Sequence, residues 1–303
     1  DFNGDLDVDG TTNLDVVDID GAVDMASTLA VGGVVTVSNG SNSAPSIAFA
    51  SDTDTGIYRG GANTLAFSAG GTARFYSDAS SYIATLTAGT SNTAIGVNAG
   101  TNIASGGNYN VVIGDESGND LTTGDHNVAI GYGALDAEDT GSKSVAIGYQ
   151  ALTTQNNDSD NYNVAIGYNS GAAITTGVQN TLIGGLAGDA NTAADNNTAV
   201  GYNALGANTT GDSNTVLGAF ALDANTTATA NTAIGLSSLG ANTTGANNTA
   251  VGKDSLLANT TGAANVAVGK GALDANTTAG DNTAVGTNSL TDNTTGALNT
   301  AVG

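Results

Sequence analysis

The sequence predicts an all-β fold in which short coils of the chain stack into a parallel β-solenoid with a 17-residue repeat. A five-residue motif, most often Asn-Thr/Val-Ala-Val/Ile-Gly, begins thirteen times between residues 92 and 303. The first four spacings between these motifs are 18, 17, 17 and 19, and the next eight are all 17. Glycine, asparagine and threonine at this density disfavour helices, and the β-branched residues of the motif favour strands. Such a period indicates a solenoid, because each unit buries its apolar residues only by stacking on its neighbours.

Composition and charge exclude several classes of protein. Only 5% of the 303 residues are aromatic and 11% are charged, so a conventional core of large side chains is excluded. The absence of cysteine excludes disulfides and thiolate metal sites. Five basic residues face 28 acidic ones, and a net charge of −23 disfavours nucleic acid and anionic membranes as partners. No apolar run is long enough for a transmembrane helix, so we expect no membrane insertion.

Residues 1–45 alternate apolar and acidic residues, which predicts short strands joined by glycine turns. Asp5, Asp7 and Asp9 have the spacing that opens a calcium-binding loop. Val16 stands where such a loop carries glutamate, so a solvated acidic face is the favoured interpretation. The three aspartates remain the candidates for a cation site.

Residues 46–91 are expected to form a compact β module. This region holds most of the phenylalanines and the only two arginines, Arg59 and Arg74. Residues 60–65 faintly resemble a calcium-binding nonapeptide, but the pattern occurs once and a hairpin turn is the favoured interpretation.

Residues 92–303 form an array of twelve complete repeats, each close to the 17-residue period, and a partial thirteenth. Position 5 of the repeat is glycine in every copy, which predicts a positive φ or an approach of another backbone too close for a Cβ atom. These structural turn glycines in the complete repeats are Gly96, Gly114, Gly131, Gly148, Gly167, Gly184, Gly201, Gly218, Gly235, Gly252, Gly269 and Gly286.

The other positions predict a thin core. Each unit is expected to have a short strand, the glycine turn, a second short strand and a polar Asn-Thr-Thr-Gly return. The branched aliphatic residue at position 4 and the leucine at position 9 are expected to form the core, padded with alanine. Position 8 is always alanine or serine, which suits a tight corner or a contact between chains. This small apolar area does not offset the entropy that is lost when a whole unit becomes ordered. We therefore expect several chains to associate.

Stacking of identical units also predicts ladders of like residues along the array. We expect a ladder of asparagines from position 1, a ladder of aliphatic residues from position 4 and ladders of threonines from positions 13 and 14.

Few side chains suggest a specific chemistry. His126 lies in a return loop without a nucleophile motif, so it is interpreted as an exposed loop residue, and we expect no catalytic residue, no cofactor and no enzyme activity. Tyrosine recurs at position 6, where it is expected to cover a groove between chains or to contact a glycan. These candidate contact residues are Tyr132, Tyr149, Tyr168 and Tyr202.

The recurring Asn-Thr-Thr sequence is formally a glycosylation signal. Its strict period favours a structural role, with the side chains hydrogen-bonding the backbone in every coil. The six asparagines are Asn208, Asn225, Asn242, Asn259, Asn276 and Asn293.

Several segments resemble known fibrous proteins. Ser144-Val-Ala-Ile-Gly148 and Asn163-Val-Ala-Ile-Gly167 resemble the head repeat of trimeric autotransporter adhesins, a left-handed parallel β-roll whose repeat is typically shorter. The longer unit, seen in residues 197–211, resembles repeat arrays in bacteriophage tail fibres. Tail-fibre modules are also similar to residues 52–74 and to residues 6–14 with 23–31.

The resemblance implies a fibrous homotrimer that serves as the structural shaft of an extracellular fibre, namely a phage tail fibre used in host attachment. Its implied partners are itself, other fibre or virion proteins and a host-surface glycan. The alternative is the head or stalk of a trimeric adhesin on a bacterial cell surface. An ice-binding solenoid is a further alternative, although the two adjacent threonines of the return loop are expected to diverge. The sequence stops partway through a repeat, so we expect a fragment of a longer protein.

Overall fold

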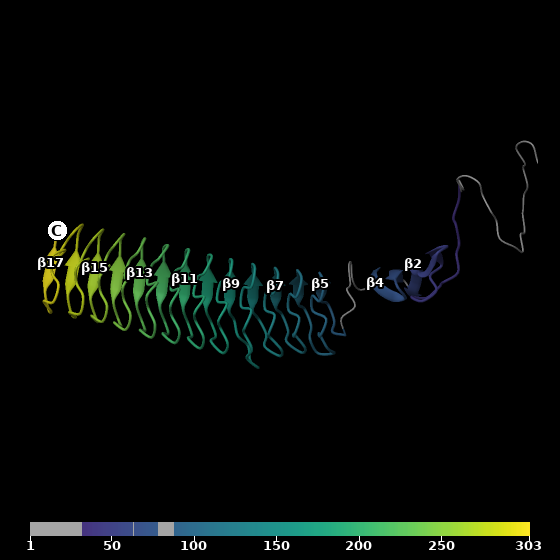
Figure 1. The fold of residues 1–303 in the computed structure, drawn as a ribbon, viewed down its shortest axis with the longest axis horizontal. Helices are drawn as coiled ribbons and strands as arrows, with labels where there is room; N and C mark the ends of the chain where they lie inside the picture. Colours follow the sequence, from purple (N-terminus) through teal and green to yellow (C-terminus); the bar gives the residue numbers. More distant parts are fainter. Residues whose placement is uncertain (1–31, 63, 78–87) are drawn as a thin grey trace, which may run out of the picture. The chain divides into compact units, whose positions relative to one another are not determined.

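The computed structural model describes residues 32–62, 64–77 and 88–303, and no helix occurs among them (Figure 1). The chain divides into two units, Asp1–Ser38 and Asn39–Gly303. In the first unit, the described residues 32–38 form no strand. Val35 and Val37 were expected in a strand from their alternation, but they are exposed, and no described strand pairs with this segment. The other strands expected near the N-terminus fall in residues 1–31, outside the described residues.

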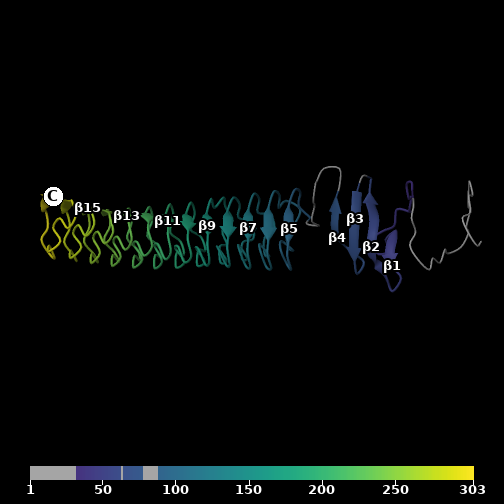
Figure 2. The ribbon, with the colours of Figure 1, turned by 90° about the horizontal axis from the view of Figure 1, so that it is seen from above.

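A four-stranded antiparallel sheet lies in the second unit (Figure 2). Its strands are β1 (Ile47–Phe49), β2 (Asp52–Gly61), β3 (Thr64–Ala69) and β4 (Thr72–Ser77), and each pairs with the next. Gly70 and Gly71, with φ of 59° and 67°, form the two-residue turn between β3 and β4. This is the geometry that favours glycine in tight hairpins.

The array is a thirteen-stranded parallel sheet in which every coil contributes one strand of three residues, and the order of strands follows the sequence. Neighbouring coils pair in register, so that Thr198 lies opposite Thr215 and Val200 opposite Leu217. The strands are β5 (Thr93–Ile95), β6 (Val111–Ile113), β7 (Val128–Ile130), β8 (Val145–Ile147), β9 (Val164–Ile166), β10 (Thr181–Ile183), β11 (Thr198–Val200), β12 (Thr215–Leu217), β13 (Thr232–Ile234), β14 (Thr249–Val251), β15 (Val266–Val268), β16 (Thr283–Val285) and β17 (Thr300–Val302).

The strands point their middle residue inward and the two flanking residues outward. In β11, Ala199 is fully buried, whereas Thr198 is exposed and Val200 is half-buried. The prediction that position 4 belongs to the core is therefore wrong. Side chains alternate along a strand, so the middle residue, position 3, points inward. It is alanine in most coils and a larger aliphatic residue at Val112, Leu182 and Val216, all of which are fully buried.

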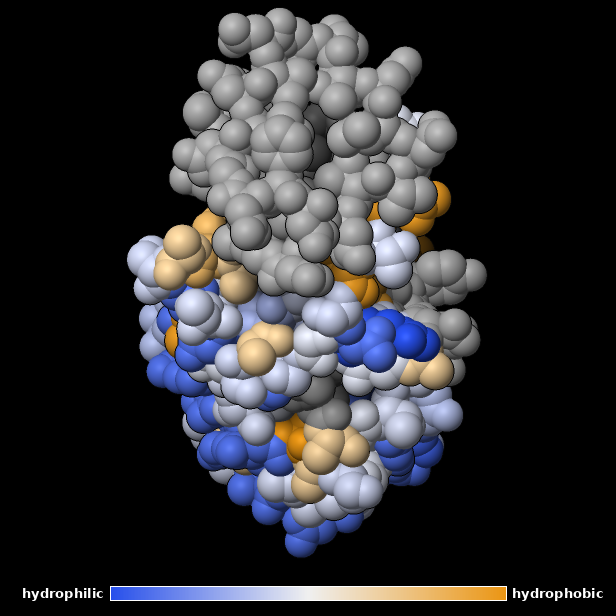
Figure 3. Space-filling model, turned by 90° about the vertical axis from the view of Figure 1, so that its right-hand side faces the viewer, coloured by the Kyte–Doolittle hydropathy of each residue, from blue (hydrophilic) through white to orange (hydrophobic). Residues whose placement is uncertain are grey.

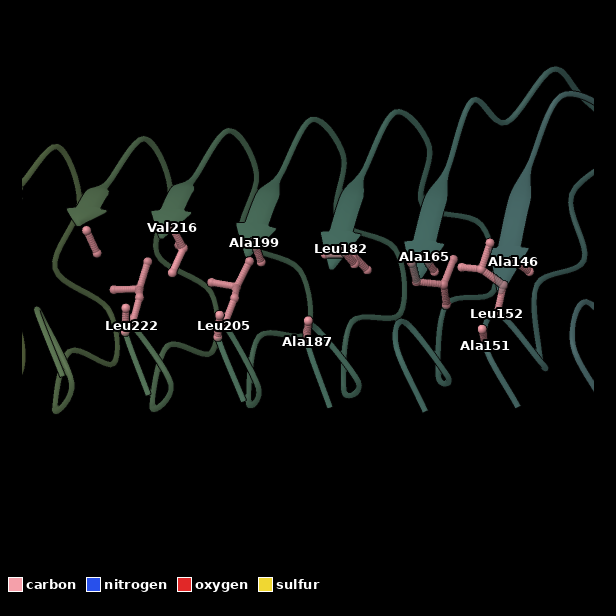
Figure 4. Close-up of a cluster of buried hydrophobic side chains, with 14 of the residues drawn as sticks. Ala146, Ala151, Leu152, Ala165, Leu182, Ala187, Ala199, Leu205, Val216 and Leu222 are labelled. Carbon is pink, nitrogen blue, oxygen red and sulfur yellow. The ribbon is translucent and has the colours of Figure 1, made fainter. Parts of the chain in front are cut away.

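The second strand expected in each unit is also absent. After Gly201, Asn203 and Leu205 have φ of 54° and 58°, so positions 7 and 9 are left-handed turn residues. These turns direct the leucine of position 9 into the coil, where Leu205 and Leu222 point toward the strands that carry Ala199 and Val216 (Figure 4). Position 8 is buried within its own coil, as at Ala204, so this column is a tight corner and makes no contact between chains.

The core of a coil is filled in more than one way. Most coils carry leucine at position 9, but some carry glycine there and a large aliphatic residue at position 12. Examples are Gly118 with Leu121 and Gly171 with Ile174, and both aliphatic side chains are fully buried. A Cβ atom at Gly171 would lie 3.1 Å from Ile174 Cδ1, so the isoleucine occupies the space that leucine fills elsewhere.

Two ladders of asparagine share this interior. At position 1, the backbone N–H of Asn214 donates to Asn197 Oδ1 at 2.9 Å, and Asn197 Nδ2 donates to the Gly211 carbonyl at 2.9 Å. This confirms the ladder that the repeat predicts for position 1. At position 12, Asn225 Nδ2 donates to Asn208 Oδ1 at 2.8 Å, although the sequence placed this residue in a polar return loop. These asparagines are fully buried, and they hydrogen-bond both the equivalent asparagine one coil away and backbone carbonyls of the return loop.

Candidate functional surfaces

The turn glycines allow neighbouring coils to approach each other. In the complete repeats their φ values lie between 130° and 146°, a region that side chains disfavour. A Cβ atom at Gly201 would lie 2.6 Å from both the C and O atoms of Gly218 in the next coil. The column therefore has a structural role, and it offers no side chain for chemistry.

The outward face of the parallel sheet is a surface without charge. It consists of positions 2 and 4 of the thirteen copies, which we call the outer β-face. Position 2 is threonine or valine and position 4 is isoleucine, valine or leucine in every copy, so none of these side chains is charged. Most are half-buried, although Leu217 is 50% exposed. Such a long uncharged strip is unusual on a chain with a net charge of −23.

The tyrosines of position 6 form a ladder at one edge of the outer β-face. The ring centroids of Tyr132 and Tyr149 are 5.3 Å apart, as are those of Tyr149 and Tyr168, and both pairs are stacked. Gly185 interrupts the ladder, and Tyr202 makes an edge-to-face contact with a phenylalanine of the next coil instead. All four tyrosines are 42–57% exposed, so their apolar area is open to a partner. A hydrogen bond to Glu116 raises the pKa of Tyr132.

A second group of rings lies at the last position of each unit, directly before the next motif. His126 is exposed and stacks on Tyr109, with ring centroids 5.0 Å apart. At the equivalent position of the next coil, Lys143 Nζ lies 2.5 Å from Asp160 Oδ2, 3.2 Å from Tyr162 Oη and 5.2 Å from the Tyr162 ring centroid. Lys143 lowers the pKa of Asp160. The contacts of Lys143 could not be predicted from the sequence, because they depend on the extra residues of the 19-residue coil.

The enlarged coil donates hydrogen bonds to a buried carboxylate of the coil before it. Glu138 replaces asparagine at position 12 and is fully buried. Its Oε1 accepts from the Gly141 backbone N–H at 2.8 Å, and its Oε2 accepts from Gln155 Nε2 at 2.8 Å and Asn161 Nδ2 at 3.1 Å. The insertion therefore supplies donors to a longer side chain in the ladder.

Glu138 and three half-buried aspartates predict an unusual dependence of stability on pH. Burial raises the pKa of Glu138, although hydrogen bonds from Gln155 and the Gly141 backbone oppose it. Burial also raises the pKa of Asp136, Asp189 and Asp223. A carboxyl with a higher pKa in the folded chain stabilises the fold at low pH, and this contribution is lost as the pH rises through the raised value. We therefore expect the melting temperature to rise as the pH is lowered from neutral toward the ordinary pKa of a carboxyl, about 4.

Thermal unfolding followed by circular dichroism at low ionic strength would measure this effect. Repulsion among the excess acidic groups acts in the same direction. The Glu138→Gln variant should show a smaller rise than the parent chain. A melting temperature that falls over the same range would contradict the prediction.

Two serines at position 8 allow a matched test of the polar interior. Ser170 Oγ donates to the Leu182 carbonyl at 2.9 Å, whereas the buried Ser238 Oγ has no hydrogen-bond partner. Seven other coils carry alanine at this position. We expect Ser238→Ala to raise the free energy of unfolding by about 1 kcal/mol and Ser170→Ala to lower it by about 1 kcal/mol. Chemical denaturation would measure both, and equal effects of the same sign would contradict the prediction.

The Asn-Thr-Thr segments form structural turns. Asn208 Nδ2 donates to the Gly211 carbonyl at 3.0 Å, and Thr209 Oγ1 donates to the Thr226 carbonyl of the next coil at 3.0 Å. Asn208 and its equivalents are buried, except for the half-buried Asn293 in the last complete coil. The second threonine, as at Thr210, is exposed, so this loop presents a single outward row of threonines.

The described residues contain no group of three or more side chains able to hold a metal ion. Asp5, Asp7 and Asp9 lie outside them, and residues 60–65 span the hairpin between β2 and β3, where Gly61 pairs with Thr64. Over the same described ranges, no helix is long and apolar enough to cross a membrane.

Comparison of the chain with protein-family models, with curated proteins and with solved structures finds no match.

Proposed function

We propose that the chain forms the shaft of an extracellular homotrimeric fibre, of the kind that bacteriophages use to attach to their hosts. Its role is mechanical, without enzymatic activity. It holds a receptor-binding element at a distance and resists proteases, because stacked coils leave few loose loops. Other fibre or virion proteins are its neighbours, and the exposed Tyr132, Tyr149, Tyr168 and Tyr202 are the candidates for contact with a host-surface glycan.

The outer β-face is the observation that carries this proposal. Two copies of a chain with a net charge of −23 repel each other over most of their surface. The outward side chains of positions 2 and 4 are uncharged, and more than half are branched aliphatic residues. Parallel copies share the same axial repeat, so one copy matches another along all thirteen strands. Closed symmetry then limits the assembly to a defined number of chains, and the resemblance to trimeric fibres favours three.

Association of the chains through the outer β-face can be tested directly. Light scattering on the purified chain should give a mass three times 29.3 kDa. Ile147→Lys places a charge on the half-buried outer β-face and should dissociate the trimer, because an unpaired buried ammonium is costly. Thr210→Lys, on the exposed return loop, is the control and should leave the trimer intact. A stable, well-folded monomer of the parent chain would overturn the proposal.

One observation favours ice binding as a second candidate. Position 2 presents an outward row of threonines on the parallel sheet, at Thr181, Thr198, Thr215, Thr232 and Thr249. This row is distinct from the adjacent Thr-Thr pairs of the return loops. It lies on the outer β-face, which a trimer would bury. A thermal-hysteresis assay on the parent chain distinguishes the two, because a trimer closed over this face would show no activity.

A further inference from the structure

Two columns of side chains flank the outer β-face, one at each end of its strands. Position 6 follows the glycine turn, and we call its column the turn edge. The residue directly before position 1 leads into each strand, and we call its column the entry edge. Around β7 the two edges carry Tyr132 and His126, and around β9 they carry Tyr168 and Tyr162. Large rings therefore stand at both ends of the same strands.

The entry edge keeps side chains where glycine would relieve strain. Its thirteen residues all have a positive φ, between 51° and 65°, a region that disfavours residues with a side chain. Position 9 has φ of the same sign and carries glycine in four coils, as at Gly118 and Gly171, whereas the entry edge carries glycine in none. Tyr109 and Tyr162 of this edge are nevertheless 57% and 49% exposed. The column thus presents large side chains that the chain itself does not cover.

We infer that the turn edge of one copy packs against the entry edge of the next copy, so that the rings of both columns line the seam between chains. This inference rests on the proposed fibre, in which parallel copies turn their outer β-faces toward a common axis. Rotation about that axis keeps every residue at its own height and brings unlike edges together, a heterologous contact that closes into a ring. Tyr149 of one copy then faces Lys143 of the next, and Tyr168 faces Tyr162.

The side chains of the two edges suit each other in these coils. Lys143 Nζ lies 5.2 Å from the Tyr162 ring centroid of its own chain, and the ring of Tyr149 offers the same contact from the next copy. Asp160 balances the charge of Lys143, so this contact brings no net charge into the seam. Between Tyr168 and Tyr162, contact buries apolar ring area while the hydroxyl groups remain hydrated.

The charges of the two edges are also complementary. No coil carries a charged residue on both edges, so rotation brings no like charges together at one height. Toward the end of the array, the turn edge carries Lys270 and the entry edge carries Asp281 one coil further along. Neither forms an ion pair within the described part of its own chain. One coil is about 4.8 Å, which a lysine side chain spans, so the two can pair between copies.

Continuity with the outer β-face favours a second copy over a host glycan as the partner of the rings. On the side of the molecule that Figure 3 shows, apolar side chains reach the surface in small patches among hydrophilic ones. The rings of the two edges instead stand in columns beside an uncharged strip, and Tyr132, Tyr149 and Tyr168 stack on one another along it. A copy that covers the strip also reaches both columns.

The chain contains no cysteine, so introduced cysteines report on this seam directly. Ser213→Cys and Ala219→Cys place one thiol on each edge of β12 and replace only small side chains. Within one chain the strand separates the two thiols, and at about 3.3 Å per residue they lie too far apart for a disulfide. Under air oxidation we expect the double variant to run as a covalent trimer on a denaturing gel without reductant, and each single variant to stay unlinked.

A second pair of cysteines examines the coils that carry the rings. Lys143→Cys with Tyr149→Cys flanks β8 in the same way and should also link three chains. The matched control combines Ala219→Cys with Thr210→Cys, because Thr210 lies on the exposed return loop and not on the entry edge. We expect this control to remain unlinked.

The outcomes separate this inference from the proposed function. Covalent trimers from both double variants, with none from the control, support the seam. If light scattering shows a trimer but neither double variant links, the inference is overturned while the fibre proposal stands, and the rings are open to a glycan. Linked dimers from a single-cysteine variant also overturn it, because like edges then meet. A monomeric parent chain overturns the proposed function, and the inference with it.

Discussion

Replacing Gly201 with alanine will lower the free energy of unfolding by about 3 kcal/mol. The φ of Gly201 is 139°, where a side chain is strained. The new Cβ atom would also lie 2.6 Å from the C and O atoms of Gly218, and a backbone cannot move aside as a flexible side chain can. The strain falls between two coils, so it weakens the stacking on which both depend. Denaturation with urea, monitored by circular dichroism, would measure the loss.

Gly240→Ala provides the matched control. Gly240 lies at position 10 and its φ is not positive, and the nearest atom to a Cβ there is the Ser237 carbonyl oxygen at 3.3 Å. Other coils carry aspartate, threonine or leucine at this position. We expect a change within about 0.5 kcal/mol. If Gly201→Ala were equally harmless, the glycine column would reflect composition and not geometry.

Removing Leu205 will have an effect of similar size, and a second substitution should reverse much of it. Leu205→Gly leaves a cavity in the core and should cost about 3 to 5 kcal/mol. Adding Asn208→Ile recreates the arrangement of Gly171 with Ile174, in which the aliphatic group enters from position 12. We expect the double variant to regain about 2 kcal/mol relative to the sum of the single changes.

The single variant Asn208→Ile completes this double-mutant cycle. It retains Leu205, so the added isoleucine overpacks the coil, and it removes the acceptor that Asn208 Oδ1 offers to Asn225. It should therefore destabilise the chain by about 1 to 3 kcal/mol. Additive effects across the cycle would show that positions 9 and 12 do not share one space, contrary to the packing described above.

The repeat period predicted most of the array. It indicated one coil per repeat, the parallel stacking of like residues and the asparagine ladder at position 1. It also placed equivalent tyrosines in successive coils, which is why Tyr132 and Tyr149 stack. Stacked identical units leave little freedom in register, because every residue meets its own equivalent.

Side-chain direction could not be predicted in the same way. A strand as short as Thr198–Val200 does not show an alternating pattern, and the larger residue was assumed to be buried. In fact Ala199 is inside, because side chains alternate along the strand and the middle residue points inward. The buried Asn208 was missed for a related reason. A polar residue is normally assigned to the surface, and only stacking reveals that its partner is the same residue in the next coil.

The contacts of surface side chains could be predicted only where these side chains recur at the same position of successive repeats. The contact of Lys143 with Asp160 depends on the extra residues in one coil, whose path the sequence does not indicate. The stacking of His126 on Tyr109 follows from their shared position at the end of successive coils, and alignment of the repeats at their last position would have found it.

Because every ladder pairs a residue with its own equivalent, whole repeats can be removed from the array or added to it without a change in register. Excision of residues 231–247 would bring Asn248 directly after Ala230, and every ladder would meet an equivalent residue across the new junction. The coils with the eight successive 17-residue spacings are thus interchangeable. The 18- and 19-residue coils have a fixed place, as has the bond from Gln155 of the 19-residue coil to Glu138 of the coil before it. Gene duplication or deletion of whole repeats would change the length of the array without changing how each coil folds. Selection can therefore act on this length independently of the fold.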